Sequence, residues 1–274
     1  MKDINKMLNM PNGDSQFDLL FEGIQLNFKV RKESGILPLV IYFHGAIDRN
    51  KRKTPVFQPF LNITGCHQLS IYDPTLDIDA SLRAGWYIGF NNKNIQKILT
   101  EFFKEIKRII NYSTLVFVGS SVGGFAALFF GSQFKDSYVL TFNPQTDITK
   151  YYPGHYKEFL SAAFPKKDES CILKNTFSLI DLYKDKCETN IYYYQSKGDD
   201  FHIKNHFLPF LQILPRELFL RSNFFFSDED GHKPPKHIYL VKTLNKILKK
   251  IEIKEMKKTQ EKNFKYLTRN YASL

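Results

Sequence analysis

The sequence predicts an α/β fold in which a mostly parallel central sheet carries helices on both faces. Short apolar runs of strand length alternate with longer segments whose apolar residues recur at helical spacing. Residues 37–43 are almost entirely apolar, which is typical of a strand buried on both faces of a sheet. The chain has 274 residues, of which 43% are hydrophobic, so it can bury a core of this kind. We therefore predict a single domain over residues 1–274.

The expected elements alternate along the chain, and this alternation makes the sheet mostly parallel. A leading hairpin is expected within residues 17–30, with Glu22-Gly23 at its turn. Further strands are expected at residues 37–43, 68–72, 114–118, 138–142 and 190–195, with the last one inside 217–226. Helices are expected at residues 94–110, directly after residue 123, at 207–214 and at 234–258. Residues 154–188 are expected to be helical and irregular.

Residues 119–123 read Gly-Ser-Ser-Val-Gly and stand between a predicted strand and a predicted helix. The pattern G-x-S-x-G in this context predicts a sharp turn that exposes its central residue, Ser121, at the edge of the sheet. Glycines flank the serine because such a turn leaves little room for side chains. A serine in this position becomes a nucleophile when a histidine and an acid assist it. The alternative is a Gly/Ser-rich turn without chemistry.

Candidates for the histidine and the acid follow the last two predicted strands. His232 comes after the final strand and before the final helix, and Asp199 and Asp200 come after the strand at 190–195. In the α/β architecture that carries such a turn, the chain order is serine, acid, histidine, with each on a loop after a strand. We predict His232 as the base and favour Asp199 over Asp200 as the acid, because Asp199 lies at the usual short step past the strand end.

His202 and His206 stand four residues apart beside the two aspartates and could also bind a metal. No further ligand cluster accompanies them, so we predict that they position the acid loop and that the protein holds no metal. Two backbone N–H groups would stabilise an oxyanion near Ser121: that of Val122, and that of Gly45 or Ala46 after the strand at 37–43. The alternative for this second loop is an ordinary turn at the end of a strand.

The formal net charge is +11, and residues 234–274 hold eleven Lys or Arg against three Glu. A helix here would pack one apolar stripe on the body and turn a lysine-rich face to solvent. That face is either simply solvated or attracts an anionic polymer, phosphorylated molecule or membrane surface. Nucleic acid is not expected, because no recognition motif accompanies the charge. The expected stripe consists of Ile238, Val241, Leu244, Leu248 and Ile251.

The three cysteines, Cys66, Cys171 and Cys187, have no metal-binding or disulfide spacing. Residues 1–10 include charged side chains and lack the sustained apolar run of a secretory leader. We therefore expect a reduced protein that acts in the cytoplasm.

The segments VGSSVGGFAALFFG, FNPQTDI, KGDDFH and DGH resemble the α/β-hydrolase-fold O-acetyltransferases encoded with bacterial capsule polysaccharide genes. The resemblance covers roughly residues 37–250 and is specific only in these short blocks. It implies an α/β-hydrolase fold with Ser121 as nucleophile, Asp199 as acid and His232 as base. Residues 154–188 stand where such a fold usually carries its lid, and the positive charge of the C-terminal stretch predicts that residues 259–274 are a basic tail of the single domain.

The activity that the resemblance implies is transfer of acetyl from acetyl-CoA to a hydroxyl of a capsule or surface polysaccharide, through an acetyl-serine. Acetyl-CoA is then the acyl donor, and an anionic polysaccharide or its precursor is the partner. Peripheral association with an anionic membrane or with capsule assembly proteins fits the basic charge. Two alternatives stay open. One is a serine esterase or deacetylase with the same triad, and the other is a non-catalytic hydrolase-like partner subunit of a glycan or secretion system.

Overall fold

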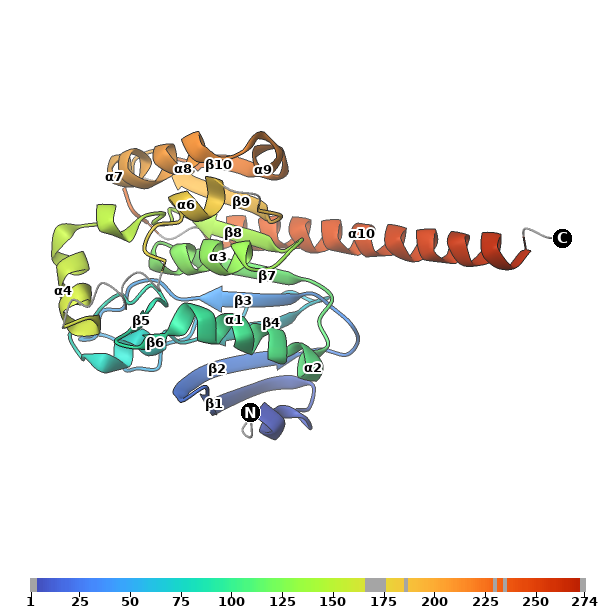
Figure 1. Cartoon of the computed structure of the whole chain (residues 1–274), viewed down its shortest axis with the longest axis horizontal. Coiled ribbons are helices and arrows are strands. Elements are labelled where there is room, and N and C mark those ends of the chain that lie inside the picture. The colour runs from blue at the N-terminus through green and yellow to red at the C-terminus, as the bar shows by residue number, and fades with distance from the viewer. Residues whose placement is uncertain (1–3, 166–175, 185–186, 229–230, 234–235, 272–274) are drawn as a thin grey trace.

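A computed structural model describes residues 4–165, 176–184, 187–228, 231–233 and 236–271 of the chain (Figure 1). Its main sheet has eight strands in the spatial order β1-β2-β4-β3-β7-β8-β9-β10, and the last six of these run parallel. The predicted α/β fold with a mostly parallel sheet is therefore confirmed. The strands are β1 (Gly13–Phe21), β2 (Ile24–Lys32), β3 (Leu39–Phe43), β4 (His67–Ile71), β7 (Leu115–Ser120), β8 (Tyr138–Phe142), β9 (Asn190–Ser196) and β10 (Asn223–Ser227).

The antiparallel part of the sheet is the leading hairpin. Strands β1 and β2 pair in register from Gly13 opposite Lys32 to Phe21 opposite Ile24, and β2 then pairs antiparallel with β4. The two turn residues, Glu22 and Gly23, have φ values of 48° and 74°. Both are left-handed, as a two-residue turn requires when it matches the twist of its strands. A separate small hairpin consists of β5 (Gly89–Phe90) and β6 (Lys93–Asn94).

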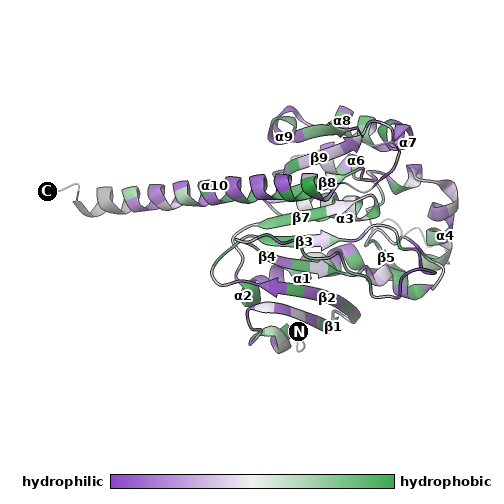
Figure 2. Cartoon of the chain, turned by 180° about the vertical axis from the view of Figure 1, so that it is seen from behind, coloured by the Kyte–Doolittle hydropathy of each residue, from purple (hydrophilic) through white to green (hydrophobic). Residues whose placement is uncertain are grey.

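Helices cover both faces of the sheet, and the strands are buried on both sides. The face that carries α1 (Ile95–Glu105), α2 (Lys107–Ile110) and α3 (Val122–Ser132) receives alternate side chains such as Leu39 and Ile41 of β3. The intervening side chains, such as Val40 of β3, point to the other face. The helix that packs on that face is α10 (His237–Tyr271), whose first turns lie beside β7 and β8 in Figure 2. This two-sided burial explains why β3 and the first four residues of β7 are apolar or aromatic at every position.

The remaining helical segments are short. In chain order they are the 3₁₀ turns η1 (Ile4–Met7), η2 (Pro74–Ile78) and η3 (Ile148–Lys150), the helices α4 (Pro153–Ala163), α6 (Ile180–Lys184) and α7 (Asp200–His202), the π-turn η4 (Ile203–Phe207), and the helices α8 (Leu208–Ile213) and α9 (Arg216–Arg221). Helix α9 occupies the first part of the segment in which only a last strand was expected. Part of the expected lid, residues 166–175 and 185–186, and the last three residues of the expected tail lie outside the described residues.

Helix α10 is longer than the predicted helix of 234–258 and has 35 residues. Its buried apolar side chains are Leu244, Ile247, Leu248 and Ile251, whereas Ile238 is 50% exposed. The expected stripe was therefore wrong at Ile238, which lies before the helix reaches the core. After Ile251 the helix leaves the sheet, and its second half projects beyond the body (Figure 1). No helix among the described residues is long and apolar enough to cross a membrane.

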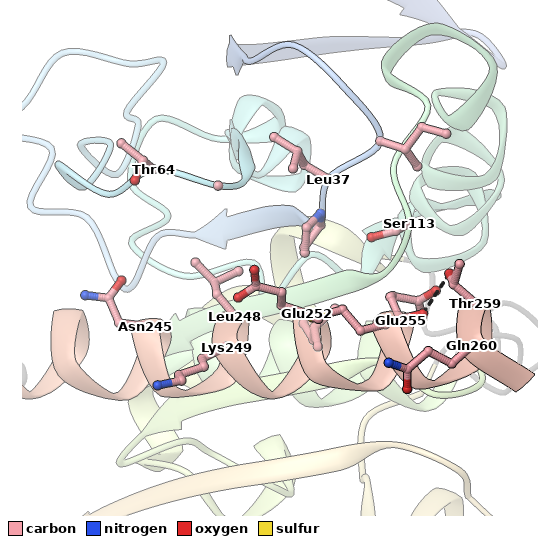
Figure 3. Close-up of a pocket in the computed structure, with 15 residues that line it drawn as sticks. Leu37, Thr64, Ser113, Asn245, Leu248, Lys249, Glu252, Glu255, Thr259 and Gln260 are labelled. Carbon is pink, nitrogen blue, oxygen red and sulfur yellow. Dashed lines mark hydrogen bonds between the residues drawn. The ribbon is translucent and has the colours of Figure 1, made fainter.

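A cavity of about 710 Å³ lies where α10 leaves the sheet. Figure 3 shows Leu37 and Ser113, which precede β3 and β7, across the cavity from Leu248 and Glu255 of the helix. These residues mark the edge at which the parallel strands begin. The loops that carry Ser121, Asp199 and His232 follow strands and lie at the opposite edge. The lysine-rich part of α10 is thus remote from the candidate site.

Candidate active site

Ser121 is the residue between strand β7 and helix α3, and its backbone has φ 54° and ψ −119°. This conformation is rare for a non-glycine residue and persists only where the surroundings impose it. The glycines on either side allow the turn. A Cβ on Gly119 would lie 2.1 Å from the carbonyl oxygen of Gly123, and a Cβ on Gly123 would lie 2.4 Å from that of Phe43. The turn that the G-x-S-x-G pattern predicts is therefore present, and it holds the Ser121 hydroxyl at the edge of the sheet.

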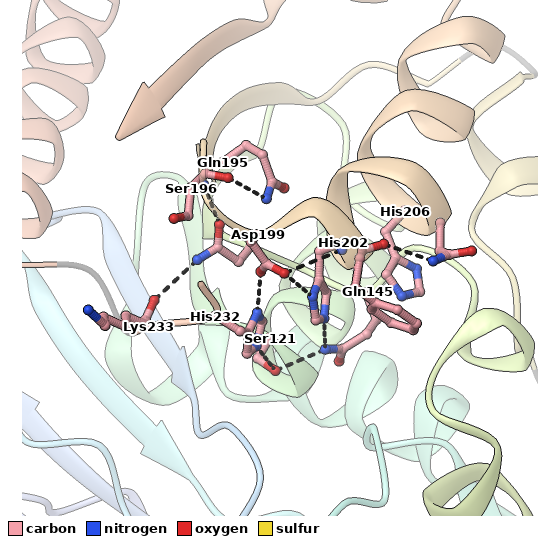
Figure 4. A network of polar contacts seen from close by, with 12 residues as sticks. Ser121, Gln145, Gln195, Ser196, Asp199, His202, His206, His232 and Lys233 are labelled. Carbon is pink, nitrogen blue, oxygen red and sulfur yellow. Dashed lines mark hydrogen bonds and ion pairs between the residues drawn. The ribbon is translucent and has the colours of Figure 1, made fainter. Parts of the chain in front are cut away.

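The structure brings the three residues named from the sequence together in one hydrogen-bonded row (Figure 4). The Oγ atom of Ser121 lies 2.8 Å from Nε2 of His232, and Nδ1 of His232 lies 2.6 Å from Oδ2 of Asp199. Asp199 is buried, whereas the neighbouring Asp200 is exposed. Serine, histidine and acid are thus arranged so that the histidine can take the serine proton and the carboxylate can orient the histidine.

The carboxylate of Asp199 is ionised despite its burial. Burial on its own raises the pKa of Asp199, but hydrogen bonds from His202 and His232 outweigh it and hold that pKa well below the usual range. Each carboxylate oxygen serves one imidazole, since Oδ1 lies 2.8 Å from Nδ1 of His202. A negative charge beside His232 favours the imidazolium that forms when the histidine takes a proton.

His202 and His206 do more than cap the acid loop. The ring of His202 stacks on that of His232 with centroids 3.9 Å apart and a 14° angle between the planes. His206 is buried, and its Nδ1 accepts a hydrogen bond from the Thr146 backbone N–H. Among the described residues the ligand-type atoms that lie together are those of Asp199, His202 and His232, and His206 is not in this group. The pair at 202 and 206 proposed as the metal alternative is thus not the pair that converges.

The loop after β8 supplies two residues that the sequence analysis did not select. The side-chain amide of Gln145 lies 2.9 Å from Ser121 Oγ and 3.1 Å from Nε2 of His202. The side chain of Asn143 accepts a hydrogen bond from the Ser196 N–H and donates one to the Lys233 carbonyl oxygen. Asn143 therefore ties the end of β9 to the loop that carries His232. The sequence did contain a signal for Asn143 and Gln145, because both are polar residues that closely follow a strand, as the other candidates do.

The loop after β3 places Gly45 next to Ser121. His44 is buried, and its Nε2 accepts a hydrogen bond from the Asp73 N–H while Nδ1–H donates to the Gly45 carbonyl. Burial lowers the pKa of His44 to about 4, so the ring is neutral and can accept that bond. Within the described part of the chain, the N–H groups of Gly45 and Val122 have no hydrogen-bond partner. Both are available to an oxyanion.

The cavity in front of Ser121 has a volume of about 310 Å³. Its lining includes Gly45, Ala46 and His232, together with the exposed cations Arg52 and Lys233. The ring of Tyr152, directly before α4, stacks on the ring of Phe201 in the acid loop with centroids 4.2 Å apart. Tyr152 lies just before the expected lid of residues 154–188, so this contact joins the start of that segment to the loop that carries Asp199.

No family model matches the sequence, and no curated protein matches it. The fold, in contrast, matches solved structures. The capsule O-acetyltransferase of Neisseria meningitidis serogroup A is 19% identical with a TM-score of 0.57, and the match covers 89% of this chain and 99% of that one. A histidine-to-alanine mutant of that enzyme in complex with CoA matches at 20% identity over 89% and 98% of the two chains, with the same TM-score.

Hydrolases match as well. The S-formylglutathione hydrolase of Agrobacterium tumefaciens is 14% identical with a TM-score of 0.50, and the match covers 86% of this chain and 93% of that one. The dipeptidyl peptidase 4 of Porphyromonas gingivalis is 14% identical with a TM-score of 0.58, over 86% of this chain and 35% of that one. The chain therefore has the α/β-hydrolase fold, and over most of its length it is structurally similar to the meningococcal capsule O-acetyltransferase.

Proposed function

We propose that the protein is a serine-dependent O-acetyltransferase that moves acetyl from acetyl-CoA to a hydroxyl of a bacterial capsule or surface polysaccharide. The observation that carries the proposal is the row Ser121–His232–Asp199 at a sharp turn between β7 and α3. The fold match to an acetyltransferase, one structure of which is a complex with CoA, favours the acyl donor.

In the first half-reaction Ser121 attacks the thioester carbonyl. The Oγ–C bond forms, His232 takes the serine proton, and the oxyanion meets the N–H groups of Val122 and Gly45. The C–S bond then breaks, and the thiolate takes the proton from His232. Asp199 stays ionised throughout and stabilises the imidazolium. Donors placed at the oxyanion are each worth about 10²–10³ in rate in related chemistry.

In the second half-reaction a sugar hydroxyl attacks the acetyl-serine. His232 takes the hydroxyl proton, the new C–O bond forms, and the bond to Ser121 breaks as His232 returns a proton to Oγ. The products are the acetylated sugar and free Ser121. Because the same histidine serves both steps, water could replace the sugar wherever it reaches the site.

The charge around the site suits the proposed substrates. Arg52 and Lys233 line the cavity in front of Ser121 and are exposed, so phosphate groups of CoA or of an anionic glycan would meet positive charge there. The net charge of +11 attracts an anionic polymer, and also an anionic membrane or an acidic capsule assembly protein, over longer range.

The second candidate function is an esterase or deacetylase that uses the same residues with water as acceptor. The fold match to S-formylglutathione hydrolase favours it.

Thiol release from acetyl-CoA, measured with and without candidate polysaccharides, separates these functions. We expect release that depends on the glycan, with acetyl appearing on the glycan. Release that ignores the glycan would indicate the hydrolase, and release by a Ser121→Ala variant would remove the serine from the mechanism. If the wild-type protein neither releases thiol nor hydrolyses simple acetyl esters, the non-catalytic alternative replaces both. Ser120→Ala is the matched control. Ser120 is the neighbouring serine of the same turn, and among the described residues the serine that hydrogen-bonds to His232 is Ser121.

A further inference from the structure

We propose that Gln145 is a further catalytic residue, whose side-chain N–H donates a hydrogen bond to Ser121 Oγ, and that His202 is the residue that positions it. This inference rests on the proposed function only in taking Ser121 as the nucleophile. It does not depend on which acyl donor or acceptor the protein uses. The contacts that carry it are shown in Figure 4, where Gln145 lies between Ser121 and His202.

The orientation of the Gln145 amide follows from Trp86. The indole nitrogen of Trp86 lies 3.2 Å from the side-chain oxygen of Gln145, and both residues are fully buried. An indole N–H only donates, so the atom that faces it must be the amide oxygen. The amide nitrogen then faces Ser121 Oγ at 2.9 Å and His202 Nε2 at 3.1 Å. Its two hydrogens satisfy these two contacts, one each.

The protons on His202 follow in turn. Because the Gln145 nitrogen donates, Nε2 of His202 must accept, and the ring proton lies on Nδ1. That Nδ1–H donates to Oδ1 of Asp199 at 2.8 Å. Asp199 therefore holds two imidazoles at once, His202 through Oδ1 and His232 through Oδ2. The indole N–H of Trp86 therefore fixes the hydrogens of both Gln145 and His202.

His202 has to remain neutral for this arrangement to hold. A proton on Nε2 would set two donors against each other at Gln145. It would also place a second positive charge against the imidazolium of His232, whose ring centroid is only 3.9 Å away. Burial lowers the pKa of His202, although the hydrogen bond to Asp199 opposes that shift, so the neutral ring is the favoured form.

The consequence for Ser121 is a fixed hydroxyl. Its proton points to His232, one lone pair accepts the N–H of Gln145, and the remaining lone pair is left for attack in the cavity. When the Oγ–C bond later breaks, negative charge builds on Oγ while His232 returns the proton. The N–H of Gln145 stabilises that charge, and because it already points at Oγ, no donor has to reorient during the reaction.

The test uses a fluorophosphonate, which labels an activated serine without CoA or glycan. In this reaction the Oγ–P bond forms, fluoride leaves and His232 takes the serine proton. We expect Gln145→Leu to lower the labelling rate constant of Ser121 about 10- to 100-fold, the loss of one buried hydrogen bond. His202→Asn keeps a donor near the Nδ1 position for Asp199 but does not reach Gln145. We expect it to lower the rate by a similar factor.

The double variant decides between positioning and general support of the fold. If His202 acts through Gln145, the double variant labels about as slowly as Gln145→Leu alone. Losses that multiply would overturn the positioning role, and a Gln145→Leu rate equal to wild type would overturn the catalytic role. Circular dichroism checks that each variant is folded at the assay temperature. If the leucine variant does not fold, Gln145→Asn is used, since it keeps an amide but shortens the side chain.

The same assay separates this inference from the proposed function. If Ser121→Ala is labelled as fast as wild type, Ser121 is not the nucleophile and both fail. If Ser121 is labelled but no acetyl is transferred from acetyl-CoA, the proposed donor fails and the role of Gln145 stands or falls by its own variant.

Discussion

The buried histidines should make the protein lose stability in mild acid, and His206 offers the sharpest test. Burial lowers the pKa of His206 to about 3, and the neighbouring imidazole of His202 adds to the shift. Its Nδ1 accepts the Thr146 N–H, and its Nε2 has no partner among the described residues. The unfolded chain therefore binds a proton near pH 6.5 that the folded protein refuses until about pH 3.

The sign and size follow from linkage. Below pH 6.5 the unfolded state binds more protons than the folded state, so the free energy of unfolding falls as the pH falls. Each pH unit costs about 1.4 kcal/mol per histidine, which gives about 2 kcal/mol for His206 between pH 7.5 and 5.0. His206→Asn removes this titration and keeps a side-chain oxygen near the position of Nδ1 to accept the Thr146 N–H.

The assay is urea unfolding at pH 7.5 and pH 5.0, followed by the fluorescence of the single tryptophan. We expect the fall in unfolding free energy between the two pH values to be about 2 kcal/mol smaller in His206→Asn than in wild type. Other groups titrate in this range, so the difference between the proteins is the quantity to compare. His237→Asn, a change at an exposed histidine at the start of α10, should leave the fall unchanged. A fall in His206→Asn equal to that of wild type would refute the reasoning.

Two further predictions concern the turn and the acid. Gly123→Ala should lower the unfolding free energy by about 1–3 kcal/mol or more in urea, because the new Cβ would lie 2.4 Å from a backbone oxygen. Gly154→Ala on α4, where a Cβ meets nothing within 4 Å, should be neutral or slightly stabilising, and equal losses in the two variants would argue against the close approach. Asp199→Asn should slow acylation of Ser121 by up to about 10⁴-fold, measured in a single turnover. Asp200→Asn should have little effect in that assay. If Asp200→Asn were the slower variant, Asp200 and not Asp199 would be the acid.

Much of the fold could be predicted from local pattern. The strand at 138–142 was predicted with the bounds that β8 has, because all of its residues except Thr141 are apolar or aromatic and the strand is buried on both faces. The turn at Ser121 could be predicted because close backbone approach leaves glycine as the only residue that fits at 119 and 123. Helix α10 was predicted too short, although residues 236–271 contain neither glycine nor proline and nothing in them ends a helix.

The polar network could be predicted only in part. Ser121, Asp199 and His232 were chosen because each follows a strand, and the structure brings them together. Gln145 follows a strand too, but its contact with Ser121 depends on how two loops meet and on the indole of Trp86, which lies 59 residues earlier in the chain. Hydrophobic periodicity and short motifs do not predict a contact between residues so far apart in sequence, since it depends on how the loops at the Ser121 edge of the sheet pack together.

Helix α10 also offers a place to immobilise the protein on a surface without covering the candidate active site. Its first half packs on one face of the sheet, and its second half continues as a straight rod away from the edge that carries Ser121 (Figure 1). At 1.5 Å per residue, the 20 residues after Ile251 extend about 30 Å. A label, bead or surface joined to the far end of this rod would leave the cavity of Ser121 facing outward. Immobilised protein should therefore keep its access to long polymers, whatever their size.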